Sequence, residues 1–224
     1  AMSKVLYSLQ IHNAITLVGS GHIQYYMPGP DGIKNGNGWM HAPSRGWMAA
    51  DSARGVGCAL TMNFPELNNF LIWEQTTMEW RYTPMHIENG AHFRTSAELI
   101  PFRDLPLVSG AGKGMVGALI HKTEAAPGES IPVEVRVFGG VPGKITAELF
   151  RRENPDEKWQ SLQKASLDFP KGNEIQSFRA AVSRPGNGGT ELEVVIRSSD
   201  GKELCRLNSR IVFGETDTPW KIDL

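Results

Sequence analysis

The sequence of 224 residues lacks the marks of several large protein classes. It holds two cysteines and no Cys-x-x-Cys pair, which argues against a disulfide-rich scaffold and a cysteine zinc site. No apolar run approaches the roughly 20 residues that a membrane-spanning helix needs. Basic and acidic side chains number 23 and 24, so the formal net charge is −1. This balance argues against a nucleic-acid-binding face and against a polybasic membrane surface.

The two cysteines, Cys58 and Cys205, each lie in a strand-like stretch, "GVGCALTMNF" and "ELCRLNSRIVF". Unpaired cysteine is among the most buried residue types, so the sequence predicts two buried free thiols. The alternative is a disulfide between them, which would need Cα atoms within about 7 Å of each other.

Helix signals are scarce as well. The best short candidates are "PELNNFLIW" (65–73) and "NPDEKWQSLQKA" (154–165), and no stretch sustains helical apolar spacing over about 12 residues. Turn formers are dense, with 24 glycines and 14 prolines separating short β-branched and aromatic runs. This pattern predicts an all-β protein.

The clearest strands lie in the second half of the chain. "IPVEVRVF" (131–138) and "KITAELFR" (144–151) alternate apolar and polar residues, which indicates one buried and one solvated face. Further strands follow up to residue 213, separated by turns such as "RPGNGG". We expect two antiparallel β-sandwich domains, an aromatic-rich one over 1–110 and an immunoglobulin-like one over 111–224. The small-residue segment 107–114, "LVSGAGKG", is the predicted boundary.

The first half of the chain is rich in aromatic side chains and histidines. Two segments carry strand patterns. In the first, strands end in an aromatic residue: "GWMAADSARGVGCALTMNFPELNNFLIW" (46–73). In the second, a turn leads into a strand: "MHIENGAHFRTSAELIPFRDL" (85–105). Over residues 40–107 this resembles part of the galactose-mutarotase-like supersandwich of aldose epimerases. The resemblance implies a sugar-associated β fold, shorter than the full supersandwich. The catalytic residues of an epimerase have no match here, so the resemblance does not imply epimerase activity.

A sugar-binding site combines aromatic rings with polar side chains, because sugars present apolar C–H faces and hydroxyl edges. The segment "WMHAPSRGW" brings two tryptophans, a histidine and an arginine together, and Arg45 suits the carboxylate of a uronate. Packing in a core is the alternative for these rings. The predicted ligand-binding residues are Trp39, His41, Arg45, Trp47, Tyr25, Tyr26, Trp80, Tyr82, His86 and His92.

Three functions fit the sequence. The first is a non-catalytic glycan-binding protein or an accessory region of a carbohydrate-active enzyme, in a secreted or periplasmic location. The second is a carbohydrate-active enzyme (epimerase, lyase or hydrolase) that uses His41, His86, His92 and Glu74. The third is a structural or assembly protein, with which a homo-oligomer is compatible. No His-x-His or His-x-x-x-His spacing occurs, so we expect no metal and no cofactor.

Overall fold

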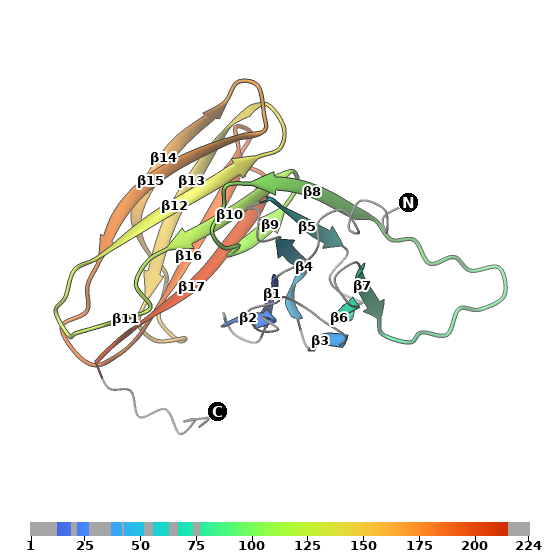
Figure 1. Ribbon diagram of the computed structural model, residues 1–224, viewed down its shortest axis with the longest axis horizontal. Helices are drawn as coiled ribbons and strands as arrows, with labels where there is room; N and C mark the ends of the chain where they lie inside the picture. Colours follow the sequence, from blue (N-terminus) through green and yellow to red (C-terminus); the bar gives the residue numbers. More distant parts are fainter. Residues whose placement is uncertain are drawn as a thin grey trace.

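The protein is all-β (Figure 1). The computed structural model describes residues 13–18, 22–26, 37–41, 43–51, 56–62, 67–73 and 77–214. The regular elements in this part of the chain are strands, and all but one of their pairings are antiparallel. The all-β prediction is therefore confirmed.

Two sheets form the N-terminal part of the molecule. The first has the order β2-β1-β4-β5-β8 and the second the order β3-β6-β7. Their strands are β1 (Asn13–Val18), β2 (His22–Tyr26), β3 (Asn37–His41), β4 (Pro43–Asp51), β5 (Val56–Met62), β6 (Leu67–Trp73), β7 (Thr77–Tyr82) and β8 (Ala97–Arg103).

Two further sheets form the C-terminal part. One has the order β15-β12-β10-β9, and the other has the order β11-β17-β16-β13-β14. Their strands are β9 (Gly110–Gly112), β10 (Met115–Ile120), β11 (Glu124–Ala125), β12 (Ile131–Gly139), β13 (Gly143–Arg152), β14 (Gln160–Phe169), β15 (Glu174–Val182), β16 (Gly188–Ser198) and β17 (Glu203–Phe213).

Period-2 patterns located the C-terminal strands correctly. On β12 the side chains of Val133, Val135 and Val137 are fully buried, and on β13 Leu149 is fully buried. These residues belong to one large core between the two C-terminal sheets. Each strand has one buried face and one wetter face, which is the arrangement that alternation predicts.

The two segments with the best helix signals are strands instead. Residues 65–73 contain β6, which pairs with β3 and β7, and residues 154–165 run into β14, which pairs with β13 along its length. In β14, Leu167 and Phe169 are buried and Asp168 between them is exposed. Pairing with a neighbouring strand and this alternate burial outweigh the weak local helix propensity.

The four sheets stack as layers around three apolar cores. Met48, Ala50, Cys58 and Leu60 on the first sheet pack against Phe70 and Met78 of the sheet β3-β6-β7. The opposite face of the first sheet packs against the outer face of the sheet β15-β12-β10-β9. That second contact consists of Trp47, Ala49, Ala59, Ile100 and Phe102 with Leu105, Val108, Ala111, Val116, Ala118 and Phe138.

Strands β4 and β5 are therefore buried on both faces. This explains why "WMAA" on β4 and "CAL" on β5 are continuous apolar runs rather than alternating ones. The N-terminal and C-terminal parts share an apolar core, and the cleft described below opens beside it.

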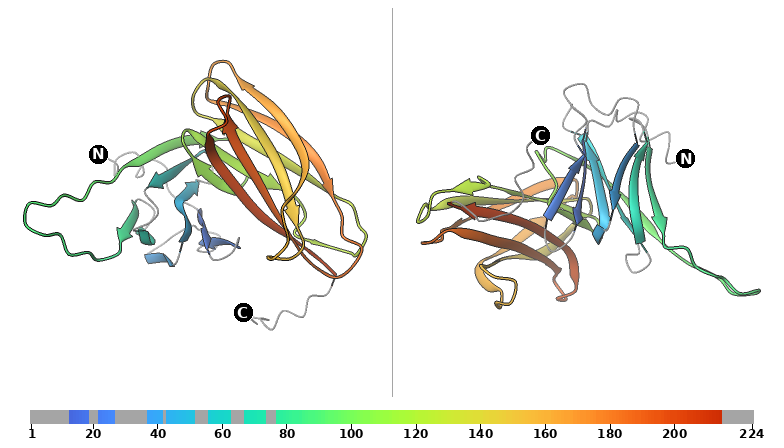
Figure 2. Two further views of the ribbon diagram at one scale, coloured as in Figure 1. Left: turned by 180° about the vertical axis from the view of Figure 1, so that it is seen from behind. Right: turned by 90° about the horizontal axis from the view of Figure 1, so that it is seen from below.

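An extended arm, residues 83–96, connects β7 to β8 and projects from the body of the protein (Figures 1 and 2). At its tip Ala91 N donates to Glu88 O at 3.0 Å, and Gly90 has φ 85°, so the predicted turn is present. At its base Tyr82 packs edge-on against Phe93, with ring centroids 5.2 Å apart, and its hydroxyl group contacts Thr95 Oγ1.

Both cysteines are buried and free, as predicted. Burial raises the pKa of Cys58 and of Cys205 to about 12, because the apolar surroundings disfavour a thiolate. The reactive form of cysteine is the thiolate, so neither side chain is a nucleophile at neutral pH.

We expect a thiol reagent such as Ellman's reagent to leave the native protein unlabelled at neutral pH and to label both cysteines in concentrated urea. The folded pKa of each thiol is raised, so its stabilising contribution is complete below the unfolded pKa of about 8.5 and declines as pH rises toward the folded value. The free energy of unfolding should therefore fall from about pH 9 upward. Rapid labelling of the native protein would contradict the buried positions.

Candidate functional site: a cleft beside the shared core

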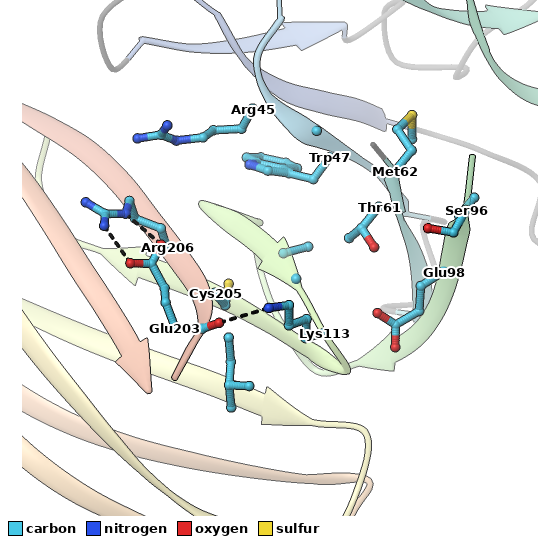
Figure 3. A pocket seen from close by; sticks show the side chains of 15 residues that line it. Arg45, Trp47, Thr61, Met62, Ser96, Glu98, Lys113, Glu203, Cys205 and Arg206 are labelled. Carbon is cyan, nitrogen blue, oxygen red and sulfur yellow. Dashed lines mark hydrogen bonds and ion pairs between the residues drawn. The ribbon is translucent and has the colours of Figure 1, made fainter. Parts of the chain in front are cut away.

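A cleft of about 630 Å³ opens where the first N-terminal sheet meets the C-terminal sandwich (Figure 3). Strands β4, β5 and β8 provide one side of it, and β9 and β17 provide the other. Its lining consists of Arg45, Gly46, Trp47, Thr61, Met62, Ser96, Ala97, Glu98, Ala111, Gly112, Lys113, Glu203, Leu204, Cys205 and Arg206.

Two of the predicted ligand-binding residues, Arg45 and Trp47, lie on β4 and line this cleft together. Alternation along the strand places them on one face of the sheet. Trp47 is only 2% exposed and packs with Phe102 and Ala111 in the shared core, so its indole forms part of the wall. Arg45 lies at the exposed edge, and Figure 3 shows its guanidinium group directed toward β17.

Glycines let β9 approach β17 closely enough to close one side of the cleft. A Cβ atom on Gly110 would lie 2.1 Å from the carbonyl oxygen of Arg206, and one on Gly112 would lie 2.6 Å from that of Leu204. No real Cβ atom tolerates such contacts with backbone, so a side chain at either position would push the strands apart. The small residues of segment 107–114 thus serve close packing against β17.

A charged network occupies the β17 side of the cleft. Arg206 Nη1 lies 2.6 Å from Glu193 Oε1, and Arg206 Nη2 lies 2.6 Å from Glu203 Oε2. Asn208 Nδ2 donates to the other oxygen of Glu193 at 3.3 Å. The hydrogen bond from Arg206 is the main cause that lowers the pKa of Glu203, and the charge of Arg45 lowers it further. Glu203 therefore stays ionised at neutral pH.

The β8 side of the cleft offers hydroxyl groups and a carboxylate. Thr61 on β5 pairs in register with Glu98 on β8, and Ser96 comes just before β8 begins. Glu98 is exposed and has no ion pair within the described part of the chain. This side can accept and donate hydrogen bonds to a polyhydroxylated ligand.

The other predicted site residues lie elsewhere. Trp39 and His41 are on β3 and Tyr25 and Tyr26 are on β2, and only their backbone is described. Glu74 lies outside the described residues.

Strand β7 and the arm carry the remaining four predicted residues. Trp80 and Tyr82 are half-buried on β7, and Trp80 packs beside the core of Phe70 and Met78. Strand β7 ends at Tyr82, so His86 lies beyond it on the arm. His86 and His92 are exposed on the arm and do not line the cleft.

Sequence reasoning missed Glu98, Lys113, Glu203 and Arg206. The first two had one usable signal each. Glu98 is a charged residue within a strand of small and apolar residues, and Lys113-Gly114 stands at a two-residue turn between strands. Glu203 and Arg206 lie about 160 residues from Arg45 in sequence, so no local pattern could place them beside it.

The described residues contain no cluster of three or more His, Cys, Asp or Glu side chains arranged to hold a metal ion. The same part of the chain has no helix with the length and apolar character needed to cross a membrane.

No family model matches the chain, and no curated protein matches it. Among solved structures, similarity is found to a β-glucosidase from Erythrobacter marinus, with 12% identity, TM-score 0.33, and coverage of 48% of this chain and 16% of that one. The sporulation control protein Spo0M from Bacillus subtilis shows 17% identity and TM-score 0.31, with 49% of this chain and 51% of that one covered. The sulfur carrier protein SoxY from Chlorobium limicola shows 21% identity and TM-score 0.30, with 44% of this chain and 79% of that one covered.

Proposed function

We propose that the protein binds carbohydrate in the cleft between its N-terminal and C-terminal parts, without catalysis, as a glycan-binding protein or an accessory region of a carbohydrate-active enzyme. The observation that carries the proposal is the composition of the cleft. Hydroxyl groups, carboxylates and cations converge on an open space of about 630 Å³, large enough for a short saccharide.

The geometry suits the chemistry of a sugar ring. Thr61, Ser96 and Glu98 offer donors and acceptors to the hydroxyl groups, and Arg45 offers a planar set of donors at the rim. Trp47 and Met62 supply apolar wall against which C–H groups can pack. Within this proposal, residues 1–110 are part of a galactose-mutarotase-like supersandwich and residues 111–224 are an immunoglobulin-like sandwich.

No histidine among the described residues lines the cleft, so the histidine-based enzyme of the second hypothesis is the weaker candidate. Its side chains His86 and His92 are on the exposed arm, in open contact with water. Catalytic groups must reach one substrate together, and neither His86 nor His92 belongs to the lining of the cleft.

The test is a titration of the protein with a panel of neutral and acidic oligosaccharides, followed by tryptophan fluorescence and calorimetry. We expect a saturable change in emission that is absent in Trp47→Phe, because Trp47 is the indole in the cleft wall. The matched control Trp159→Phe should keep the signal, since Trp159 lies beside Arg152, away from the cleft. Glu98→Gln should weaken binding about tenfold, the effect of losing a charge-assisted hydrogen bond. Absence of calorimetric heat with every saccharide would refute the proposal.

A further inference from the structure

The cleft is polarised along its length. Figure 3 shows Arg45 and Arg206 toward β17 and the amine of Lys113 directed to Glu203, whereas Thr61, Ser96 and Glu98 line the opposite side. On the β17 side the three cations outnumber the two carboxylates, Glu193 and Glu203, by one. A ligand that spans the cleft would therefore meet a net positive charge on that side and hydroxyl groups with Glu98 on the other.

Two of the three cations keep their charge available to a ligand. Arg206 is occupied by Glu193 and Glu203. Arg45 is exposed and forms no ion pair with a described residue, although its charge reaches Glu203. Lys113 Nζ donates one hydrogen bond, 3.3 Å long, to the main-chain oxygen of Glu203, and that oxygen carries no formal charge.

The backbone of Lys113 is in the left-handed region, which is energetically unfavourable for a lysine. Lys113 has φ 42° and Gly114 has φ 75°, and together they form the tight turn between β9 and β10. Turns with two left-handed residues favour Asn, Asp or Gly at the first position, where a lysine is strained. The side chain of this residue lines the cleft, where it is one of three cations.

From these features we infer that the ligand is an anionic saccharide, whose carboxylate or sulfate group binds between Arg45 and Lys113 while its hydroxyl groups face Thr61, Ser96 and Glu98. This inference rests on the proposed function and narrows it to acidic sugars. Arg45 provides the planar pair of donors that matches an oxyanion, and Lys113 provides a point charge beside it.

The experiment compares three probes by calorimetry: a galacturonate trisaccharide, a sulfated galactose trisaccharide and the neutral galactose trisaccharide. At low ionic strength at least one acidic probe should bind about tenfold tighter than the neutral one, and added salt should reduce the difference. Lys113→Asn should weaken the acidic probe about tenfold and leave the neutral probe within about twofold, and Arg45→Ala should weaken the acidic probe more than the neutral one.

Two measurements separate a binding role from a structural one. Lys113→Asn should unfold at a higher urea concentration than the wild type, because asparagine tolerates a positive φ, and still lose acidic-sugar affinity. Lys164→Ala, which removes an exposed lysine from β14, should change neither property. Equal affinity for acidic and neutral probes, or unchanged acidic affinity in both cleft variants, overturns the inference and leaves the proposed function standing. Binding of none of the probes, with no heat from the wider panel, overturns both.

Discussion

Replacing Phe169 by alanine is expected to lower the free energy of unfolding by about 3–5 kcal/mol, the range measured for truncation of a buried phenylalanine. Phe169 ends β14, is fully buried, and belongs to the core between the two C-terminal sheets. Its ring lies directly on the backbone of β12, since a Cβ atom on Gly139 would sit 2.7 Å from Cδ1 of the ring. The side chain thus joins the two sheets, and its loss leaves a cavity that rigid strands cannot close.

Urea unfolding followed by circular dichroism measures this change. Val141→Ala is the matched control, because Val141 is 53% exposed and its truncation should cost less than about 0.5 kcal/mol. A loss below about 1 kcal/mol for Phe169→Ala would mean that the ring does not fill the core as described.

A double-mutant cycle tests the specific contact between this ring and the glycine beneath it. Gly139→Ala alone should be strongly destabilising, because the new methyl group meets the ring of Phe169 at 2.7–3.0 Å. In the Phe169→Ala background the methyl group enters vacated space. The double variant should therefore be more stable than the sum of the two single changes predicts, by at least about 1 kcal/mol. Additive effects would show that the two residues do not touch.

The fold was readable from the sequence wherever one face of a strand meets water. Residues 131–138 and 144–151 alternate for this reason, and they are strands β12 and β13. Around residues 154–165 the alternation is interrupted, because Leu162 and Ala165, both partly buried against the core, stand three residues apart where the pairing with β13 shifts register. This spacing produced the weak helix signal. The pairing of β14 with β13 is a tertiary effect that a local pattern does not contain.

Only part of the candidate site could be predicted from the sequence. Arg45 and Trp47 were predicted because a cation and an aromatic ring stand two residues apart in the sequence, and both line the cleft. The rings on β7 and the histidines of the arm are residue types that suit a sugar equally well, but they lie away from the cleft. The opposite side of the cleft comes from β9 and β17, brought to β4 by the shared core. Composition therefore identifies residue types that suit a sugar, and topology decides which of them meet.

Loss of Arg206 should have the second large effect on stability. Glu193 is 5% exposed, and its partners are Arg206 and Asn208. In Arg206→Met the carboxylate stays buried with one weak neutral donor, so we expect a loss of about 3 kcal/mol in the free energy of unfolding at neutral pH. Lys122→Ala, which breaks the exposed pair with Glu129, should cost less than about 1 kcal/mol and serves as the control.

A second substitution separates the buried charge from lost packing. In Arg206→Met, changing Glu193 to Gln removes the unpaired buried charge and retains an acceptor for Asn208, so at least about 1 kcal/mol should return.

The pH dependence of stability gives an independent check. Because Arg206 lowers the pKa of folded Glu203, that carboxylate stabilises the wild type above its unfolded pKa of about 4.3, and the contribution is lost as pH falls through the folded value. Arg206→Met should lose less stability in acid than the wild type, and parallel acid profiles would contradict the pairing of Arg206 with Glu203.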